Sequence, residues 1–147
     1  MKTKSIKPLS ADQKYLLCKI GHPKHLDTFV NDTIPSVKGN VAEFGNDKHR
    51  DILVHDEHPY VSQKVAEFGN DKHRDQLVHD PSPNVRWKVA EFGNDKHRDQ
   101  LVHDKDPWVR QDVARYGNEN HARALMNDED IDVNRDARNR LQELVNH

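Results

Sequence analysis

The side chains with the most evident chemistry in this sequence are histidines that recur at one fixed spacing. His25, His49, His73, His97 and His121 follow one another at intervals of 24 residues. Imidazoles in series suggest a metal site. However, stacked helices lie about 8–10 Å apart, whereas two nitrogens on one metal lie roughly 3 Å apart because each metal–nitrogen bond is about 2 Å long. We therefore expect no metal, and we expect each ring to hydrogen-bond to an adjacent turn as a structural group.

A second histidine series could also form pairs with aspartates. Three histidines each follow an aspartate by four residues, namely Asp51 and His55, Asp75 and His79, Asp99 and His103. Residues four apart lie side by side on a helix. Zinc could use this spacing, but we expect solvated ion pairs.

Basic residues flank the first histidine series and could contact phosphate. Three copies read Lys-His-Arg, and their basic residues are Lys48, Arg50, Lys72, Arg74, Lys96 and Arg98. As a stripe they would be the phosphate contacts of a nucleic-acid-binding protein. Aspartates bracket each copy, as Asp95 and Asp99 do around Lys96. Interleaved charges are more typical of salt bridges between repeats, so nucleic-acid binding is the alternative hypothesis.

The overall charge and the absence of catalytic motifs exclude further classes. The 147 residues carry 23 Lys and Arg against 25 Asp and Glu, a formal net charge of −2. A tight nonspecific nucleic-acid binder has a basic footprint instead. The sequence shows no nucleophile–base pair with an orienting group, no glycine-rich phosphate loop and no zinc-knuckle spacing. We therefore expect no enzymatic activity, no catalytic residues and no cofactor.

The cysteine content and the apolar runs bear on the compartment. Cys18 is the only cysteine, so no internal disulfide can form. It stands where later repeats have alanine, and we expect a small buried residue rather than a reactive thiol. No apolar run reaches membrane-spanning length, and the basic N-terminus lacks the apolar stretch of a signal peptide. These features predict a cytoplasmic protein without a membrane partner.

The elements that must position all these side chains are 24-residue repeats. The unit at residues 65–88 has near copies at 41–64 and 89–112, and divergent copies at 17–40 and 113–136. A fixed period in this range is typical of a solenoid. Such an array needs only a thin core, so a hydrophobic content of 33% does not indicate disorder.

Capping segments are predicted at both ends of the repeat array. Residues 1–16 are predicted to form an N-terminal arm and the start of a capping helix. Ser10 and Gln13 have the spacing of a capping box, and Gly21 is a suitable stop. Residues 137–147 are predicted to form the C-terminal capping helix, whose outer side is polar.

Each repeat predicts two helices. In the longer helix Ser82 is the expected N-cap, Pro83 the first helical residue and Gly93 the stop. Asn94 is the expected N-cap of the shorter helix, for which the sequence leaves α and 3₁₀ geometry open. As C-terminal stops, Gly69 and Gly93 are expected at positive φ.

Two phrases carry a family resemblance. DPSPNVRWKVAEFG at residues 80–93 and DKDPWVRQDVARYG at 104–117 resemble the D-P-x-V-R-x-x-V-A signature of bacterial HEAT-like repeats. The 24-residue period is similar to that of the leucine-rich repeat variant family, which pairs an α-helix with a 3₁₀ or short helix. Over residues 17–136 the resemblance implies an all-α, right-handed α-solenoid of about five two-helix repeats.

The sequence also departs from the leucine-rich repeat variant pattern. That pattern favours Asn-Pro after the first helix and more leucines, where this chain has glycine and a single Leu-Val pair. Some members of that family carry a cysteine-ligated iron–sulfur cluster, which one cysteine cannot hold. The resemblance does not transfer a function, because such solenoids serve many partners.

The candidate binding residues lie in the half-repeat that varies most. In the central copies this half reads EHPYVSQK, PSPNVRWK and KDPWVRQD, and its candidate partner-binding residues are Tyr60, Arg86, Trp87, Trp108 and Arg110. Trp, Tyr and Arg dominate binding energy where contact desolvates them. The alternative, which the sequence leaves open, is that the rings cover the edge of a neighbouring repeat.

The preferred prediction is a non-enzymatic module that binds a protein partner, acting as an adaptor or inhibitor. Its nearly identical units suggest a phage or other mobile element. The sequence does not indicate which protein is bound.

Overall fold

A computed structural model describes residues 6–146, and within this range every regular element is an α-helix and no strand occurs. Residues 1–5 of the predicted arm and His147 lie outside it. The long helices are α1 (Ala11–Ile20), α3 (Pro35–Phe44), α5 (Pro59–Phe68), α7 (Pro83–Phe92), α9 (Pro107–Tyr116) and α11 (Ile131–Val145). The short helices are α2 (Pro23–Phe29), α4 (Asp47–Leu53), α6 (Asp71–Leu77), α8 (Asp95–Leu101) and α10 (Glu119–Leu125). No helix in the described range is long and apolar enough to cross a membrane.

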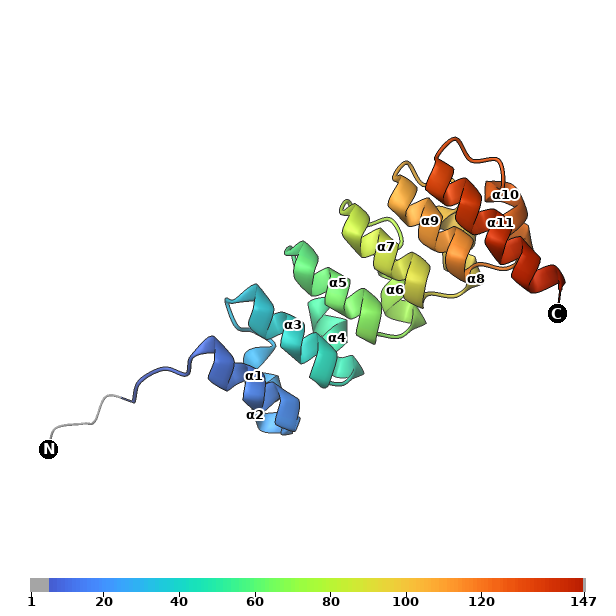
Figure 1. The fold of residues 1–147 in the computed structure, drawn as a ribbon. Coiled ribbons are helices and arrows are strands. Elements are labelled where there is room, and N and C mark those ends of the chain that lie inside the picture. The colour runs from blue at the N-terminus through green and yellow to red at the C-terminus, as the bar shows by residue number, and fades with distance from the viewer. Residues whose placement is uncertain (1–5, 147) are drawn as a thin grey trace, which may run out of the picture.

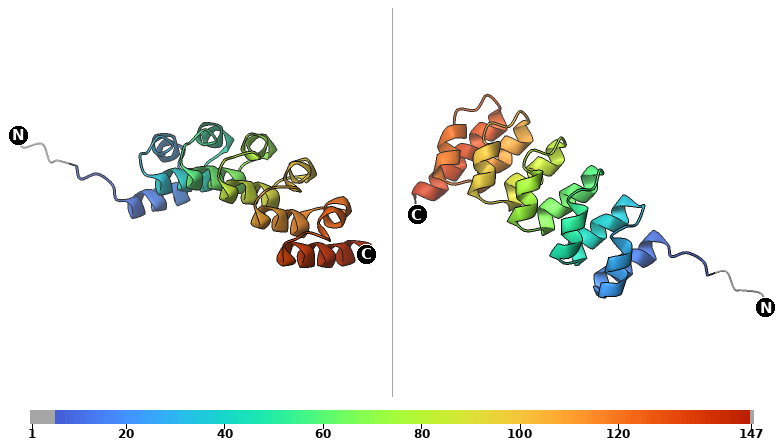
Figure 2. Two further views of the ribbon diagram at one scale, coloured as in Figure 1. Left: turned by 90° about the horizontal axis from the view of Figure 1, so that it is seen from above. Right: turned by 180° about the vertical axis from the view of Figure 1, so that it is seen from behind.

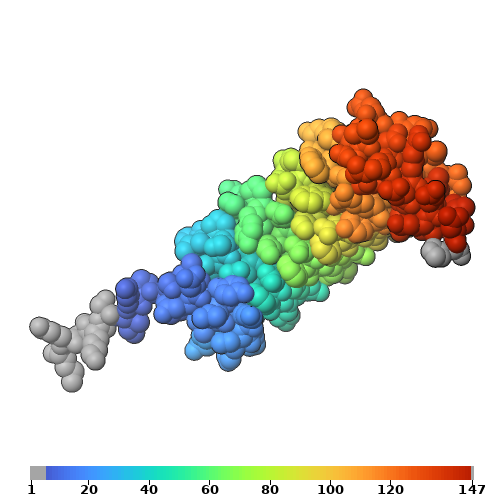
Figure 3. Space-filling view, in the orientation of Figure 1, coloured from blue at the N-terminus to red at the C-terminus, as the bar shows by residue number. Residues whose placement is uncertain are grey.

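The long helices pack side by side in one row, and the short helices form a second layer behind them (Figure 1). Seen from above, the array follows a gentle arc (Figure 2). The short helices fan out on the outer side of this arc, and the long helices lie along its inner side. The predicted α-solenoid of two-helix repeats is confirmed. We call the solvent-facing side of the long-helix row the inner face; it is continuous from α1 to α11 in the space-filling view (Figure 3).

Local sequence signals explain where the long helices begin. Proline occupies the first turn of α3, α5, α7 and α9, where its missing N–H costs no helical hydrogen bond. The N-caps differ in strength. Asp106 accepts hydrogen bonds from the backbone N–H groups of Trp108 and Val109. Ser82 holds the predicted N-cap position of α7, but its side chain makes no capping bond.

All the short helices are α-helices, which answers the question left open by the sequence, and α4, α6, α8 and α10 start with an asparagine–histidine capping box. In α8 the Asn94 side chain accepts the backbone N–H of His97 at 3.2 Å. In return His97 Nδ1 accepts the backbone N–H of Asn94 at 3.0 Å. Asn46, Asn70 and Asn118 form the same box in their repeats. The predicted N-cap is therefore confirmed, with histidine as the reciprocal partner.

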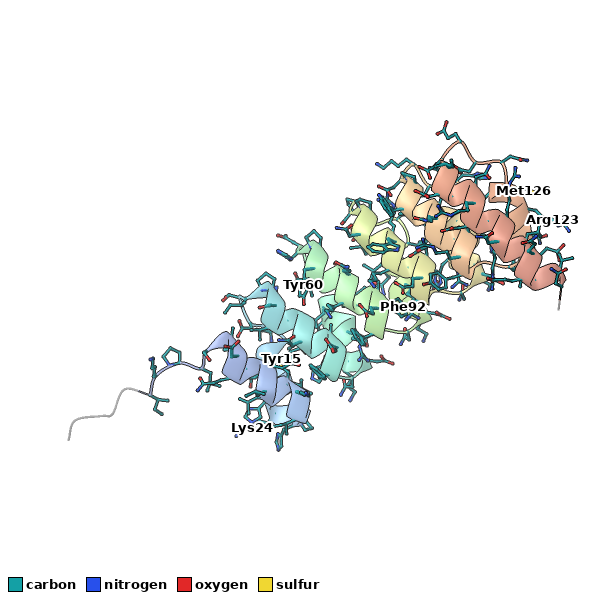
Figure 4. The ribbon with its side chains drawn as sticks, viewed as in Figure 1. Tyr15, Lys24, Tyr60, Phe92, Arg123 and Met126 are labelled. Atoms are coloured by element: carbon teal, nitrogen blue, oxygen red, sulfur yellow. The ribbon has the colours of Figure 1, made fainter. Side chains whose placement is uncertain are left out.

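A thin core runs along the array between the two layers. From α3 to α10, each pair of helices buries two valines and an alanine from its long helix and a leucine from its short helix, as Val85, Val89, Ala90 and Leu101 show. Cys18 is buried at the alanine position, as predicted. Phe92 follows Val85 and Val89 at helical spacing, and this spacing predicts that it shares their buried side. It is instead exposed at the edge of the inner face (Figure 4).

The predicted backbone of Gly69 and Gly93 is wrong. Their φ angles are −79° and −77°, with ψ at −176° in both, so the backbone is extended rather than left-handed. A Cβ on Gly93 would lie 2.4 Å from the Val89 carbonyl oxygen and 2.8 Å from His97 Nδ1. Glycine is required there because these two groups approach too closely for a side chain.

Both ends of the array have distinct caps. The capping box of Ser10 and Gln13 is present, and Gly21 ends α1 at a φ of 75°, as predicted. At the other end α11 begins at Ile131, because Asp130 accepts the N–H groups of Asp132 and Val133. The expected boundary between residues 136 and 137 therefore falls inside one continuous helix.

Candidate partner-binding surface

The buried histidines form a ladder that joins successive repeats. His97 Nδ1 accepts the Asn94 N–H, so Nε2 carries the proton and donates to Asp75 of the preceding repeat at 2.7 Å. His49, His73 and His121 make the equivalent bonds to Asp27, Asp51 and Asp99. The predicted structural role is confirmed for these four rings. His25, in the first repeat, stacks on Phe29 instead.

The second histidine series does not form the predicted pairs. Asp51, Asp75 and Asp99 each bond to the histidine of the following repeat. His79 instead contacts Gln100, with His79 Nε2 at 3.0 Å from Gln100 Oε1. Between residues 6 and 146 no group of three or more His, Cys, Asp or Glu side chains is arranged to hold a metal ion.

The arginines of the Lys-His-Arg copies donate hydrogen bonds to backbone carbonyl groups of their own repeat. Arg98 Nε donates to the Ala90 carbonyl at 2.9 Å and Nη2 donates to the Glu91 carbonyl at 3.1 Å. Burial lowers the pKa of Arg98. Arg50 and Arg74 close the ends of α3 and α5 in the same way. Lys48, Lys72 and Lys96 remain exposed.

Arg86 and Arg110, two of the predicted partner-binding residues, serve the scaffold. Arg86 is only 5% exposed and donates two hydrogen bonds to Asp104, at 2.8 and 2.9 Å. Arg110 binds Asp128 in the same way one repeat later, and these bonds hold the pKa of Asp128 below its usual range. Each guanidinium therefore links its long helix to the turn before the next long helix.

The three predicted aromatic residues lie toward the inner face, but their surroundings differ. Trp108 is 64% exposed and Tyr60 37% exposed, whereas Trp87 is partly buried against the core. The Tyr60 ring rests on Gly39 of the preceding repeat, where a Cβ would come within 2.5 Å of the ring. Tyr60 thus covers the edge of a neighbouring repeat, which is one of the two alternatives that the sequence left open, and Figure 4 shows it on the long-helix row.

Trp108 stands between two hollows on this surface. The first has a volume of about 290 Å³ and is lined by Pro83, Asn84, Trp87, Asp106 and Trp108. The second is smaller, about 90 Å³, and lies on the other side of the ring, where Asp130 and Asp132 contribute carboxylates. An exposed indole flanked by apolar and acidic groups can bury apolar area and accept a polar or cationic group.

Charged residues on the inner face pair across neighbouring long helices. Lys64 Nζ lies 3.2 Å from Glu43 Oε2 of the preceding repeat. In the same way, Lys88 Nζ lies 3.8 Å from Glu67 Oε2 of its preceding repeat. In α9 the residue at the lysine position is Asp112, which faces Glu91 of α7 instead of completing an ion pair with it. The lysine–glutamate pairing across neighbouring long helices therefore stops at the junction of α7 and α9, where Glu91 pairs with Lys88 of its own helix and Asp112 pairs with Arg115 of its own helix.

Asp112 is an unusual group for this surface. It is only 3% exposed, and its carboxylate accepts one long hydrogen bond, from Arg115 at 3.4 Å. Burial raises the pKa of Asp112 to about 6, and the charge of Glu91 adds to the rise while Arg115 and Lys88 oppose it. Asp112 is therefore a buried carboxylate whose ion pair with Arg115 is long, at 3.4 Å.

Comparisons with known proteins give a limited result. No family model matches the chain, and no curated protein matches it. A designed armadillo repeat protein is 16% identical with a TM-score of 0.40, over 90% of this chain and 86% of that one. An engineered protein is 17% identical with a TM-score of 0.46, over 95% and 87%. Another designed armadillo repeat protein, in complex with the peptide (KR)4, is 15% identical with a TM-score of 0.37, over 90% and 86%. Such low TM-scores assign neither a family nor a partner to this chain.

Sequence reasoning missed Asp112 and Asp106 as members of this surface. The signal for Asp112 was present, because aligning the repeats puts Lys64, Lys88 and Asp112 at one position and reveals a reversal of charge. Asp106 could not be found this way, because its part in the hollow depends on how closely α7 and α9 approach.

Proposed function

We propose that this chain is a non-enzymatic helical-repeat module that binds a protein partner through its inner face, with Trp108 at the centre of the contact. The observation that carries the proposal is the exposure of Trp108, at 64%, beside a hollow that Trp87 also lines. Exposed tryptophan next to a pocket is the usual composition of a binding hot spot. The fold itself does not use this ring, since the valine core lies on the opposite side of α9.

The remaining predicted residues have graded roles in the proposal. Trp87 forms one wall of the hollow beside Trp108. Tyr60, which lies two repeats before Trp108, would contribute a further aromatic contact. Arg86 and Arg110 fix the long helices in place through Asp104 and Asp128. Their effect on binding would be indirect, through the position of the helices that carry the tryptophans.

Nucleic-acid binding finds less support. The three arginines of the basic copies are occupied by backbone carbonyls. Only Lys48, Lys72 and Lys96 remain exposed, on the short helices at the outer side of the arc. We expect affinity for duplex DNA no tighter than about 10⁻⁶ M at physiological salt, the nonspecific range. Submicromolar binding would favour the nucleic-acid hypothesis instead.

The family relation also belongs to this proposal. The motif residues shared with HEAT-like repeats have clear tasks here, since Val85 and Val89 form the core and Arg86 binds Asp104. We place the repeats among HEAT-like and leucine-rich repeat variant solenoids, with an adaptor or inhibitor role and an origin in a phage or mobile element. An experimental structure showing a left-handed array would contradict this relation.

The direct test is affinity capture with the wild-type chain and matched variants as bait. Trp108→Asn introduces the residue that α7 carries at the same position, Asn84, so the helix start is preserved. We expect the captured protein to be bound 10- to 100-fold more weakly by this variant, which corresponds to about 1–3 kcal/mol. The melting temperature should change by only a few degrees, because surface changes usually cost about 0.5 kcal/mol. Lys96→Ala, on the outer side, should capture normally. Normal capture by Trp108→Asn and by Trp87→Gln would contradict the proposal.

A further inference from the structure

In two of the long helices, α5 and α7, a lysine lies over aromatic rings of its own helix on the inner face. In α5 the residues Tyr60, Lys64 and Phe68 follow at four-residue intervals, and Lys64 Nζ lies 5.9 Å from the centroid of the tyrosine ring and 5.2 Å from that of the phenylalanine ring. In α7 Lys88 Nζ lies 5.5 Å from the Trp87 centroid and 5.1 Å from the Phe92 centroid. Ammonium groups at these distances are attracted by the ring quadrupole.

The helix α9 repeats the rings without the lysine. Trp108, Asp112 and Tyr116 stand at the same four-residue intervals as Tyr60, Lys64 and Phe68. Both rings of α9 are exposed. The middle position carries a carboxylate instead of an ammonium group, and between residues 6 and 146 no lysine or arginine is seen over either of these two rings.

Carboxylates gather around these rings, although several of them have partners. Lys64 and Lys88 each reach a glutamate of the preceding repeat, whereas at the same position α9 has Asp112, which pairs with Arg115 of its own helix at 3.4 Å. Glu91 pairs with Lys88 at 3.0 Å. Further acidic residues line the two hollows beside Trp108, namely Asp106 on one side and Asp130 and Asp132 on the other, and of these Asp132 pairs with Arg135 at 2.7 Å. Asp106 and Asp130 use Oδ1 to cap their helices, so the second oxygen takes no part in the cap.

We propose that the surface formed by Trp108, Asp112 and Tyr116 binds a lysine or arginine side chain that the protein partner supplies in place of the missing lysine. This inference rests on the proposed function and names the chemistry of its partner. The rings of Trp108 and Tyr116 contact the cation. Asp112, at 3% exposure, does not contact the cation directly, and its negative charge attracts the cation from below the surface. We call this surface the cation seat.

A lysine peptide tests the seat without knowledge of the natural partner. The chain contains two tryptophans, so its indole N–H groups give two NMR signals, which Trp87→Phe assigns. We expect titration with an acetylated and amidated tetralysine peptide to shift the Trp108 signal saturably. The same peptide with Nε-acetylated lysines keeps the length and loses the charge, and it should leave the signal unmoved.

Variants at position 112 separate the seat from a general attraction to negative charge. Asp112→Lys supplies the lysine that α5 and α7 carry, so it should fill the seat and weaken peptide binding at least tenfold. Asp112→Asn removes the charge at nearly constant size and should weaken binding several-fold, which keeps the test open if the lysine variant folds poorly. Glu57→Lys, at an exposed loop position, makes the same change of net charge and should bind within about twofold of wild type.

Two results would overturn the inference. One is equal binding of the acetylated peptide, and the other is an Asp112→Lys variant that is folded and binds like Glu57→Lys. Failure of the seat is distinguishable from failure of the proposed function. If Trp108→Asn loses the captured partner while tetralysine does not bind, the partner-binding surface stands and the cationic chemistry is wrong. If Trp108→Asn and Trp87→Gln both capture the partner normally, the proposed function itself is wrong.

Discussion

Asp112 occupies the position that lysine holds in the two preceding repeats, and this single exchange gives the inner face its one buried and poorly paired carboxylate among the described residues. Groups that stabilise nothing and are costly to bury are candidates for function. The neighbouring histidines show the opposite case, since each ring nitrogen there has a partner. The scaffold and the candidate site are therefore distinguishable residue by residue.

The raised pKa of Asp112 makes a prediction about stability and pH. Its carboxyl has a pKa of about 6 in the folded protein and about 3.9 when unfolded. The folded state therefore holds the proton more tightly, and stability is lost as the pH rises from about 4 to about 6. Asp112→Asn should melt at a higher temperature than wild type at pH 7.5, by an amount worth up to about 3 kcal/mol.

The same comparison contains its own control. Lys88 and Glu91 from α7, Arg115 from α9 and Asp136 from α11 surround this part of the face, and all are unchanged in the variant. The two proteins should converge in melting temperature below pH 4. A constant difference across this range would show that Asp112 does not titrate as described.

A second prediction at this scale concerns the close contacts of Gly93. Gly93→Ala places a methyl group against the Val89 carbonyl and His97 Nδ1, so the chain must shift or the capping box must break. We expect a loss of about 1–3 kcal/mol, the usual cost of overpacking, measured by urea unfolding. An unchanged midpoint would mean that the turn has room which the structure does not show.

At the scale of helices, the sequence predicted both elements of each repeat and their caps, because these signals are local. Proline, asparagine and the aspartate at position 106 act within one turn of the residues they cap. The bonds that the sequence did not predict for Arg86 and for the aspartates of the second histidine series join distant residues. Arg86 meets Asp104, 18 residues away, and Asp75 meets His97, 22 residues away. Such pairs lie beyond a single helix, so periodicity within the helix could not reveal them.

The ladder that Arg86 belongs to is interrupted once, and this makes a prediction for α5. Lys14, Lys38, Arg86 and Arg110 each bind an aspartate 18 residues later. At the equivalent position α5 has Ser62, whose hydroxyl donates to the Asp56 carbonyl. Ser62→Arg should reach Asp80 and raise the free energy of unfolding by about 1 kcal/mol, as hydrogen bonds between charged groups do.

Urea unfolding of Ser62→Arg and Ser62→Ala would check this point. The alanine variant removes the hydroxyl without adding a cation and should unfold near the wild-type midpoint. Ser62→Arg could instead unfold at a lower urea concentration than the wild type and Ser62→Ala. The space beside Asp80 would then differ from that beside Asp104, and the repeats would be less equivalent than their sequences suggest.

At the scale of the whole molecule, the array is a stack of units that touch their neighbours. This arrangement was predictable, since the period alone indicates it. Which side is inner was not predictable, because the curvature depends on how closely the long helices pack relative to the short ones (Figure 2). The location of Trp108 on the inner face therefore became apparent only in three dimensions.

Modularity predicts the outcome of deletions. Removing residues 65–88 joins Lys64 to Val89 in the same register and should leave a shorter, folded helical array. Removing residues 65–76 alone breaks the register and should abolish cooperative unfolding. Circular dichroism during a thermal melt distinguishes the two, and equal loss of structure in both would contradict a stack of independent units.

The central claim is that the inner face at α7 and α9 contacts a protein partner while the outer side only holds the array together. Site-specific photocrosslinking tests it most directly, with a benzophenone side chain placed either at Asn84, which lines the hollow beside Trp108, or at Lys96, exposed on α8. The account predicts a crosslinked partner from position 84 and none from position 96. A partner crosslinked from position 96 and not from position 84 would contradict it.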